Sequence, residues 1–173
     1  MRKIFQTSFI AAAAALAISL CGCGYHVGFI KHPQLNTLAV APAVNETAVY
    51  NAASDVRMMM SEVVVQDGTF KLVDQKKADA VIFMTVKRIS YAEVSEASVT
   101  DSDTYRPNEW AVNVAVEYSV IIPGQAGAIR SGTVEGSTIF QASTDIESSR
   151  LRAVRQASYN ACRKIIYNIA EGW

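Results

Sequence analysis

The sequence has few residues of the kinds that carry chemistry in enzymes and metalloproteins. It contains two histidines and three cysteines in 173 residues, and its basic and acidic residues are equal in number, at 16 each. This balance is not typical of proteins that bind nucleic acids or anionic membranes through a basic face. We therefore expect no nucleic-acid partner and no membrane attachment through charge alone.

Motifs for catalysis and cofactor binding are absent as well. The sequence has no Gly-x-Ser-x-Gly, no Gly-x-Gly-x-x-Gly and no phosphate-binding loop. Its histidines, His26 and His32, are not spaced for a helical or hairpin zinc site. Asp101 and Asp103 could pair or hold a cation, but a solvated polar hairpin is the simpler interpretation. We expect no enzyme activity, no metal and no cofactor.

The N-terminus has the parts of an export signal. Residues 1–3 are positively charged at Arg2 and Lys3, and residues 9–20 form an unbroken run of apolar and small residues. That run is shorter than the roughly 20 apolar residues that a membrane-spanning helix needs. The pattern predicts a cleaved signal rather than a transmembrane anchor.

The residues after the apolar run, Leu20-Cys21-Gly22-Cys23, resemble the lipobox of bacterial lipoproteins. The pattern places an aliphatic residue three before the lipidated cysteine and a small one directly before it, which fits Cys23. Leu20 is too large to precede Cys21 in that role. We predict that residues 1–22 are removed and that Cys23 carries the lipid. An ordinary secretory signal with incidental cysteines is the alternative.

Cleavage leaves roughly 150 residues, enough for one domain with a sizeable core. The mature chain has two more acidic than basic residues, because Arg2 and Lys3 leave with the signal. An acylated Cys23 cannot form a disulfide, so Cys162 is expected to be a small core residue. Residues 23–36 have Gly and Pro breaks and no periodicity, which indicates a lipidated tether. Residues 37–173 are expected to form a single α/β domain.

The first part of that domain is predicted to contain a strand, a helix and a second strand. Residues 37–41 are mostly apolar and stop at Pro42, and residues 70–73 form another short strand. Between them, apolar residues from Val49 to Val64 recur at spacings of three and four, typical of an amphipathic helix. Asn45 and Thr47 are candidates for its N-cap, and Asp67-Gly68 for its end.

Longer strands and a second helix follow. Residues 80–84 predict a central strand, residues 95–108 a polar hairpin, and residues 112–122 a regular alternating strand. Residues 128–140 predict a weaker strand near an edge, loosened by Gly132 and Gly136. Residues 146–170 predict a helix, whose apolar stripe comprises Leu151, Val154, Ala157, Ala161, Cys162, Ile165 and Ile169.

The order β-α-β-β-β-β-α predicts an α/β fold. Both helical stripes can be buried at once if the helices share one face of the sheet. We therefore expect a two-layer sandwich, with a mixed four- to five-stranded sheet and two helices on one face.

Several short motifs, taken in order, resemble the lipopolysaccharide-assembly lipoprotein family (LptE). They are Cys23-Gly24-Tyr25-His26, Leu38-Ala39-Val40-Ala41-Pro42 with Asn45-Glu46-Thr47, Asp67-Gly68-Thr69-Phe70-Lys71-Leu72-Val73-Asp74, Ala78-Asp79-Ala80-Val81 and Val120-Ile121-Ile122-Pro123-Gly124. The resemblance implies an outer-membrane lipoprotein that plugs a large β-barrel partner of the LptD type, helps it assemble and assists lipopolysaccharide insertion into the outer leaflet. It implies a lipid-anchored domain that faces the periplasm.

Other readings of the same segments stay open. The first half is also similar to periplasmic lipoproteins that activate penicillin-binding proteins or build curli-type secretion pores. A pore builder should carry a long alternating hairpin for membrane insertion, which the polar residues 95–108 do not supply. An outer-membrane lipoprotein with another role is a third interpretation.

Three arginines are candidates for binding lipopolysaccharide phosphates, which need accessible cations. Arg106 lies in the predicted hairpin, and Arg150 and Arg152 open the second helix. We expect the hairpin and the start of that helix to lie at the same end of the sheet. Three solvated surface arginines without a ligand are the alternative.

Overall fold

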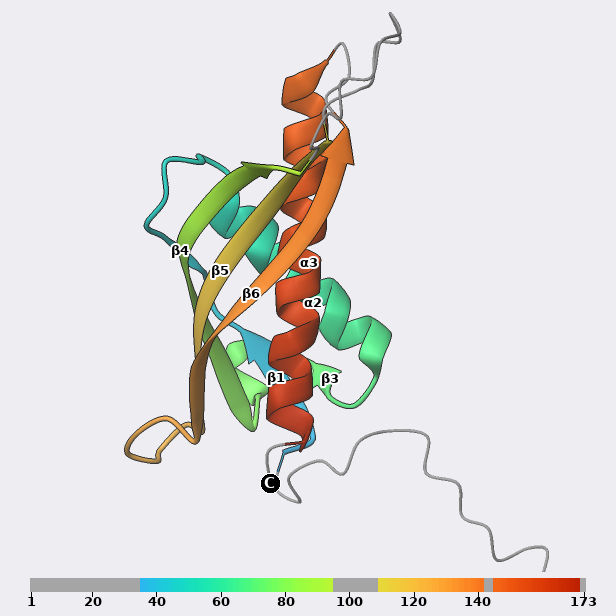
Figure 1. The fold of residues 1–173 in the computed structure, drawn as a ribbon. Coiled ribbons are helices and arrows are strands. Elements are labelled where there is room, and N and C mark those ends of the chain that lie inside the picture. The colour runs from blue at the N-terminus through green and yellow to red at the C-terminus, as the bar shows by residue number, and fades with distance from the viewer. Residues whose placement is uncertain (1–34, 95–108, 142–144, 172–173) are drawn as a thin grey trace, which may run out of the picture.

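The computed structural model describes residues 35–94, 109–141 and 145–171. Their elements, in chain order, are β1 (Thr37–Val40), β2 (Val44–Asn45), α2 (Ala52–Asp67), β3 (Lys71–Leu72), the 3-10 turn η1 (Gln75–Lys77), β4 (Ala80–Glu93), β5 (Glu109–Ile121), β6 (Arg130–Gln141) and α3 (Ile146–Glu171). Figure 1 shows the three long strands side by side, with α3 running along them. This is the predicted order, with β2 and η1 added.

The strands form one mixed sheet in the order β3-β1-β4-β5-β6. β1 is parallel to both β3 and β4, whereas β5 is antiparallel to both of its neighbours, β4 and β6. β2 runs parallel to β4 beyond the end of β1, with Val44 opposite Thr85. The predicted fold class is confirmed, and the two-residue strand β2 is the element that the sequence did not reveal.

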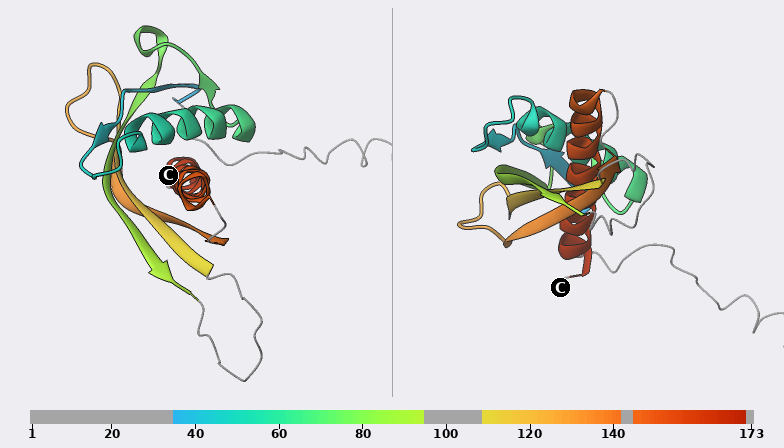
Figure 2. Two further views of the ribbon diagram at one scale, coloured as in Figure 1. Left: turned by 90° about the horizontal axis from the view of Figure 1, so that it is seen from above. Right: turned by 45° about the horizontal axis from the view of Figure 1, so that its top comes forward.

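Both helices cover the same face of the sheet, as predicted. The left view of Figure 2 shows the sheet curving around α3, while α2 lies across α3. Alternate residues of β4 and β5, such as Ile82 and Val116, are buried against Met60 of α2 and Ile165 of α3. These side chains belong to one continuous apolar core. Both α2 and α3 therefore occupy the concave side of the sheet, and neither of them covers its convex side.

β6 lies at one edge of the sheet, as expected, but Gly136 has a different role from the predicted one. A Cβ atom on Gly136 would lie 2.0 Å from the carbonyl oxygen of Ala157 and 2.3 Å from the amide nitrogen of Ala161. The backbone of α3 thus approaches the backbone of β6 directly. A glycine is required at position 136 because any side chain would collide with the backbone of α3.

Two details of the helices differ from the prediction. Asn45 and Thr47 do not cap α2, which begins at Ala52 after Asn51. They form a turn instead, in which the amide of Thr47 donates to Oδ1 of Asn45 and Nδ2 of Asn45 donates to the carbonyl of Val49. The predicted end is confirmed: Gly68 has a left-handed φ of 71°, and its N–H donates to Val64.

The residues predicted to form the apolar stripe of α3 are buried, except at the start of the helix. Leu151 is 47% exposed, whereas the other six residues of the stripe are buried. The first turns of α3 lie beside the far end of the strands, where less of the sheet remains to cover them. At the other end of the domain, Leu35 is fully buried, so the core begins two residues before β1.

Candidate functional site

The start of the folded domain and the start of α3 lie at opposite ends of β4. Leu38 pairs with Ala80 at the beginning of β4, and Arg150 lies over Tyr91 near its end. At about 3.3 Å per residue, these positions are roughly 35 Å apart. Figure 1 shows both ends, with β1 at the bottom and the first turn of α3 at the top. We call the top region, where β4 and β6 end and α3 begins, the arginine end.

Arg150 is held against the sheet at the arginine end. Its guanidinium carbon lies 5.0 Å from the centre of the Tyr91 ring, and its Nη1 lies 3.3 Å from Oε1 of Glu147. The Tyr91 ring meets Phe140 edge-on, with 6.4 Å between the ring centres. Burial raises the pKa of Tyr91 against the opposing effect of Arg150, so this phenol is neutral at physiological pH. Arg150 is therefore oriented, but its side chain is still 42% exposed.

Arg152 borders a depression between β6 and α3. The depression measures about 450 Å³, and its wall includes Thr138, Ile139, Phe140, Gln141, Ser149, Arg152, Ala153 and Gln156. Nη2 of Arg152 donates to Oγ of Ser149 at 3.4 Å. The arrangement places an exposed cation beside an apolar side chain, Ile139, that is 59% exposed. A ligand with an anionic group and an apolar group fits these contacts.

The N-terminus of α3 is already capped by acidic groups. The amide of Ser148 donates to Oδ1 of Asp145, and that of Ser149 donates to the carbonyl oxygen of Asp145. Hydrogen bonds from Ser148 lower the pKa of the Asp145 carboxyl. With Asp145 and Glu147 at its first turn, this helix end repels an anion. An anionic ligand would have to approach the arginines from the side of the depression.

The third predicted residue, Arg106, lies outside the described residues, as do Cys21 and Cys23. The strands that flank residues 95–108 do end beside α3: the amide of Val94 donates to the carbonyl oxygen of Glu109 at 2.9 Å, and Tyr91 contacts Arg150. Half-exposed apolar side chains lie at the same end, namely Val94, Ile139, Ile146 and Leu151. The arginine end is thus amphipathic, with two described cations and an apolar rim.

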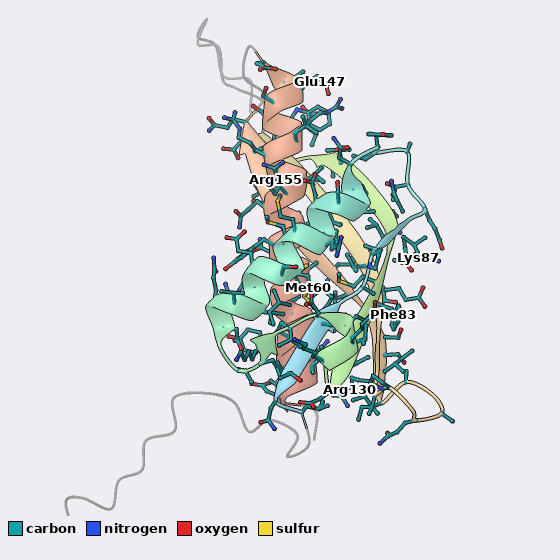
Figure 3. The ribbon with its side chains drawn as sticks, turned by 180° about the vertical axis from the view of Figure 1, so that it is seen from behind. Met60, Phe83, Lys87, Arg130, Glu147 and Arg155 are labelled. Carbon is teal, nitrogen blue, oxygen red and sulfur yellow. The ribbon has the colours of Figure 1, made fainter. Side chains whose placement is uncertain are left out.

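An ion pair that the sequence did not reveal joins the two helices. Asp55 of α2 is buried on the α3 side, and its Oδ1 lies 3.3 Å from Nη2 of Arg155. The side chain of Arg155 remains 51% exposed, so water solvates its outer part. Figure 3 shows Arg155 where α3 passes behind α2. The pair fixes the crossing of the helices at their surface.

Cys162 is a core residue, as predicted. Its Sγ lies 3.6 Å from the carbonyl oxygen of Val56, and burial raises the pKa of the thiol to about 12. A thiol with that pKa is neutral and unreactive at physiological pH. Within the described ranges, no three His, Cys, Asp or Glu side chains are grouped as a metal site. No helix in these same ranges is long and apolar enough to cross a bilayer.

The middle of the convex face of the sheet is polar and balanced in charge. Nζ of Lys87 lies 2.6 Å from Oε2 of Glu46 and 3.7 Å from Oε2 of Glu117. Nη2 of Arg88 lies 2.6 Å from Oε1 of Glu135. Figure 3 labels Lys87 and Phe83 on β4 and Met60 on α2. Two further rows on this face are polar, Thr85–Glu117–Thr133 and Ser90–Asn113–Ser137. Nearer to β1 the face is apolar, with Phe83 39% exposed and a small buried cluster of Ala39, Ala41 and Val81. The polar middle of the face is therefore suited to contact with water or with another polar surface.

Comparisons with known proteins give relatives in fold. No family model and no curated protein matches the sequence. Among solved structures, a candidate lipoprotein from Caulobacter crescentus matches with a TM-score of 0.52 and 12% identity, over 76% of this chain and 87% of that one. The PelC dodecamer from Paraburkholderia phytofirmans matches with 0.51 and 12%, over 84% and 94%. A hypothetical protein from Chlamydia trachomatis matches with 0.54 and 9%, over 79% and 96%.

The likeness is one of fold. At such low identity it carries no residue of a functional site from one protein to another. None of the three is named as a lipopolysaccharide-assembly protein, so the resemblance to LptE rests on the short motifs of the sequence.

Proposed function

We propose that this chain is an outer-membrane lipoprotein, anchored through Cys23, that plugs and helps assemble a β-barrel lipopolysaccharide translocon of the LptD type. In this role it assists the insertion of lipopolysaccharide into the outer leaflet. It acts as a binding and assembly protein, without catalysis, metal or cofactor.

The observation that supports this proposal best is the separation of the two ends of the domain. The chain enters the fold near Leu35, and the arginines lie roughly 35 Å away along β4. The hydrocarbon core of a bilayer is about 30 Å thick. A domain anchored in the periplasmic leaflet and seated in a barrel could therefore present its arginine end near the level of the opposite leaflet.

The surface of the domain is compatible with the lumen of a barrel. Lumens are polar and wet, and they accept a rigid plug whose charges are compensated. The middle of the convex sheet face meets this description, because Lys87 and Arg88 are each paired with glutamates and the rows that contain Thr85 and Ser90 are polar. An apolar face of that size would instead aggregate or dock on hydrophobic surfaces.

Lipopolysaccharide would contact the arginine end. Its phosphates would pair with Arg152 and with the exposed part of Arg150, and Arg106 would add a third cation. Its acyl chains would lie against the apolar rim of Ile139 and Leu151, which are exposed in the free domain. Charge and apolar contact side by side are what an amphiphilic glycolipid requires.

Purification of the lipidated chain from membranes in mild detergent tests the barrel role. The proposal predicts a stoichiometric complex with one large β-barrel, identified by mass spectrometry. Mass spectrometry of the same sample should show acylated Cys23 at the N-terminus. A chain that purifies alone from intact membranes, or that retains Cys21, contradicts the corresponding part of the proposal.

Lipopolysaccharide binding is tested with single charge reversals in the same purified chain. Arg152→Glu should weaken binding by about tenfold or more, because a charged hydrogen bond contributes roughly 1.5–3 kcal/mol. Arg150→Glu and Arg106→Glu should each weaken it too, and Arg163→Glu, near the other end of α3, should not. Equal binding in all four variants removes this site but leaves the plug role standing.

A second candidate function follows from the fold. The PelC structure is a dodecamer, and the first half of the sequence is similar to lipoproteins that build curli-type secretion pores. A periplasm-facing lipoprotein of that class would purify as an oligomer of many copies, and one that activates a penicillin-binding protein would purify with that protein. The detergent experiment separates these outcomes by mass.

A further inference from the structure

One edge of the sheet has room for a further strand. β3 pairs with β1 through Lys71 and Leu72, and the last bond along this edge runs from the amide of Val73 to the carbonyl oxygen of Leu38. Beyond Val73 the chain leaves the strand and forms η1, which packs against β1. No strand of the described residues pairs with this edge between Val40 and Asn45. The edge of the sheet along β1 and β2 is therefore paired with β3 only at Thr37 and Leu38, and the rest of this edge could pair with a further strand.

Backbone amide and carbonyl groups along this edge point away from β4, toward the place of an added strand. The amide of Ala41 donates to Ile82 and that of Glu46 donates to Val86, so both residues face β4. By the alternation of a strand, the backbone groups of Val40 face the opposite way. The backbone groups of Asn45 do so too on the same alternation. Unpaired amide and carbonyl groups along a strand edge are a template for strand addition.

A continuous groove lies beside this edge. It consists of two hollows of about 520 and 620 Å³, which share the residues Pro42, Arg57 and Ser61. The upper hollow adds Ala53 and Met58 of α2, and the lower one adds Leu72 and Asp74. Figure 3 shows this side, with α2 in front and the blue strand β1 beside its lower half. The groove thus runs between a helix and an uncovered strand edge.

The helix side of the groove carries a cation without a counterion. Arg57 is exposed, and none of the ion pairs found among the described residues includes it. It lies on α2 one turn before Ser61, whose hydroxyl donates to the Arg57 carbonyl oxygen. Met58, next to Arg57, is 48% exposed and forms an apolar wall above it. A ligand strand would place a carboxylate at Arg57 and an apolar side chain at Met58.

The opposite edge of the sheet is protected from such pairing. Nδ2 of Asn160 donates to the outward carbonyl oxygen of Ser137 at 2.9 Å, and Nζ of Lys164 donates to that of Glu135 at 2.7 Å. These two side chains of α3 take the acceptors that an added strand would need. Strand addition is therefore directed to the edge beside Arg57.

We propose that the groove between α2 and the β1–β2 edge binds an extended peptide segment of a partner protein by strand addition. The segment has apolar residues in alternation and a Glu or Asp side chain that pairs with Arg57. This inference is independent of the proposed function, because it uses neither the arginine end nor the lipid.

Selection from a library of random seven-residue peptides tests the proposal, with the purified mature chain as the target. We expect enrichment of peptides in which apolar residues alternate and one acidic residue recurs at a fixed position. Arg57→Glu should reverse the preference at that position to Lys or Arg. Arg163→Glu, an exposed charge reversal on α3, should leave the selection unchanged. No enrichment, or enrichment that Arg57→Glu does not alter, overturns the proposal.

Hydrogen exchange with the best selected peptide distinguishes strand addition from a surface charge contact. The amides of Val40 and Asn45 should exchange at least tenfold more slowly in the complex. The same peptide with alternate backbone nitrogens methylated should lose both binding and protection, because it cannot donate to the strand edge. Protection confined to the arginine end, or binding by the methylated peptide, contradicts strand addition.

Discussion

The two helices pack against the same sheet in different ways. α3 lies so close to β6 that a Cβ atom on Gly136 would collide with the helix backbone, and its side chains bind the carbonyls of the strand edge. α2 packs through long side chains such as Met59 and Met60, and a groove remains beside it. In the α3 half, small residues allow close contact between helix and strand, and side chains of the helix occupy the strand edge. In the α2 half, a groove remains beside the helix, and the strand edge is open.

The largest effect is expected from a charge in the closed half. Ile165 is fully buried between α3 and the sheet, so Ile165→Asp places an unpaired carboxyl in the core. We expect a loss of about 4 kcal/mol or more in the free energy of unfolding. Denaturation of the mature chain by urea measures it. Asn168→Asp, at an exposed position of the same helix, should change stability little, and equal stability of both variants would refute the burial of this stripe.

The close approach of α3 and β6 gives the next largest effect. Gly136→Ala should cost about 3 kcal/mol, the upper end of the usual range for overpacking, because the new methyl group meets backbone atoms that cannot rotate away. Gly132→Ala is the matched control in the same strand. Its Cβ would lie 3.4 Å from a ring atom of Tyr118, an ordinary contact. If both variants melt at the same temperature, the helix does not approach the strand as described.

The ion pair at the helix crossing should contribute less. Asp55→Asn should cost about 1 kcal/mol or less, because Arg155 is half exposed and water screens the pair. Arg155→Ala should cost more than Asp55→Asn, since it leaves the buried Asp55 carboxylate without its cation. A double-mutant cycle measures the coupling. A coupling energy of zero would show that the pair does not hold the two halves together.

The smallest effect concerns the start of the α2 half, where Asp79 binds the chain before β1. Its Oδ2 accepts hydrogen bonds from the amides of Asn36 and Thr37, and interactions with Thr37 and Asn36 lower its pKa below the usual value of 3.8. A lowered carboxyl pKa stabilises the fold above the unfolded-state pKa, and this stabilisation is lost as the pH falls through the folded-state value. Below pH 4, Asp79→Asn should therefore lose stability less steeply than the wild type. Unfolding of the wild type and of Asp79→Asn, measured at a series of acidic pH values, checks this prediction. The same dependence of stability on pH in both proteins would contradict it.

The sequence was sufficient for the elements whose pattern is local. The alternation from Val112 to Val120 located β5, and the spacing from Val154 to Ile169 located the buried side of α3. Gly68 marked the end of α2, because a left-handed residue there is a local requirement. Each of these features depends only on residues close by in the sequence, so a single segment is enough to predict it.

Features that depend on distant segments could not be predicted in this way. β2 is two residues long and exists because it reaches β4, some 40 residues along the chain. Asp55 meets Arg155 across 100 residues, and the need for Gly136 is visible only once α3 lies against β6. At the candidate site, the sequence selected Arg150 and Arg152 for their position and charge. Their contacts with Tyr91 and Ser149, and the groove beside Arg57, required the fold.

Site-specific photo-crosslinking in intact cells tests the central claim, that the domain is seated in a barrel, most directly. A photoreactive residue at Asn113, in the middle of the convex sheet face, should crosslink the chain to one large outer-membrane β-barrel. The same chain without irradiation should give no crosslink to another protein. Crosslinks from Asn113 to further copies of the chain, or to no barrel at all, would contradict the account.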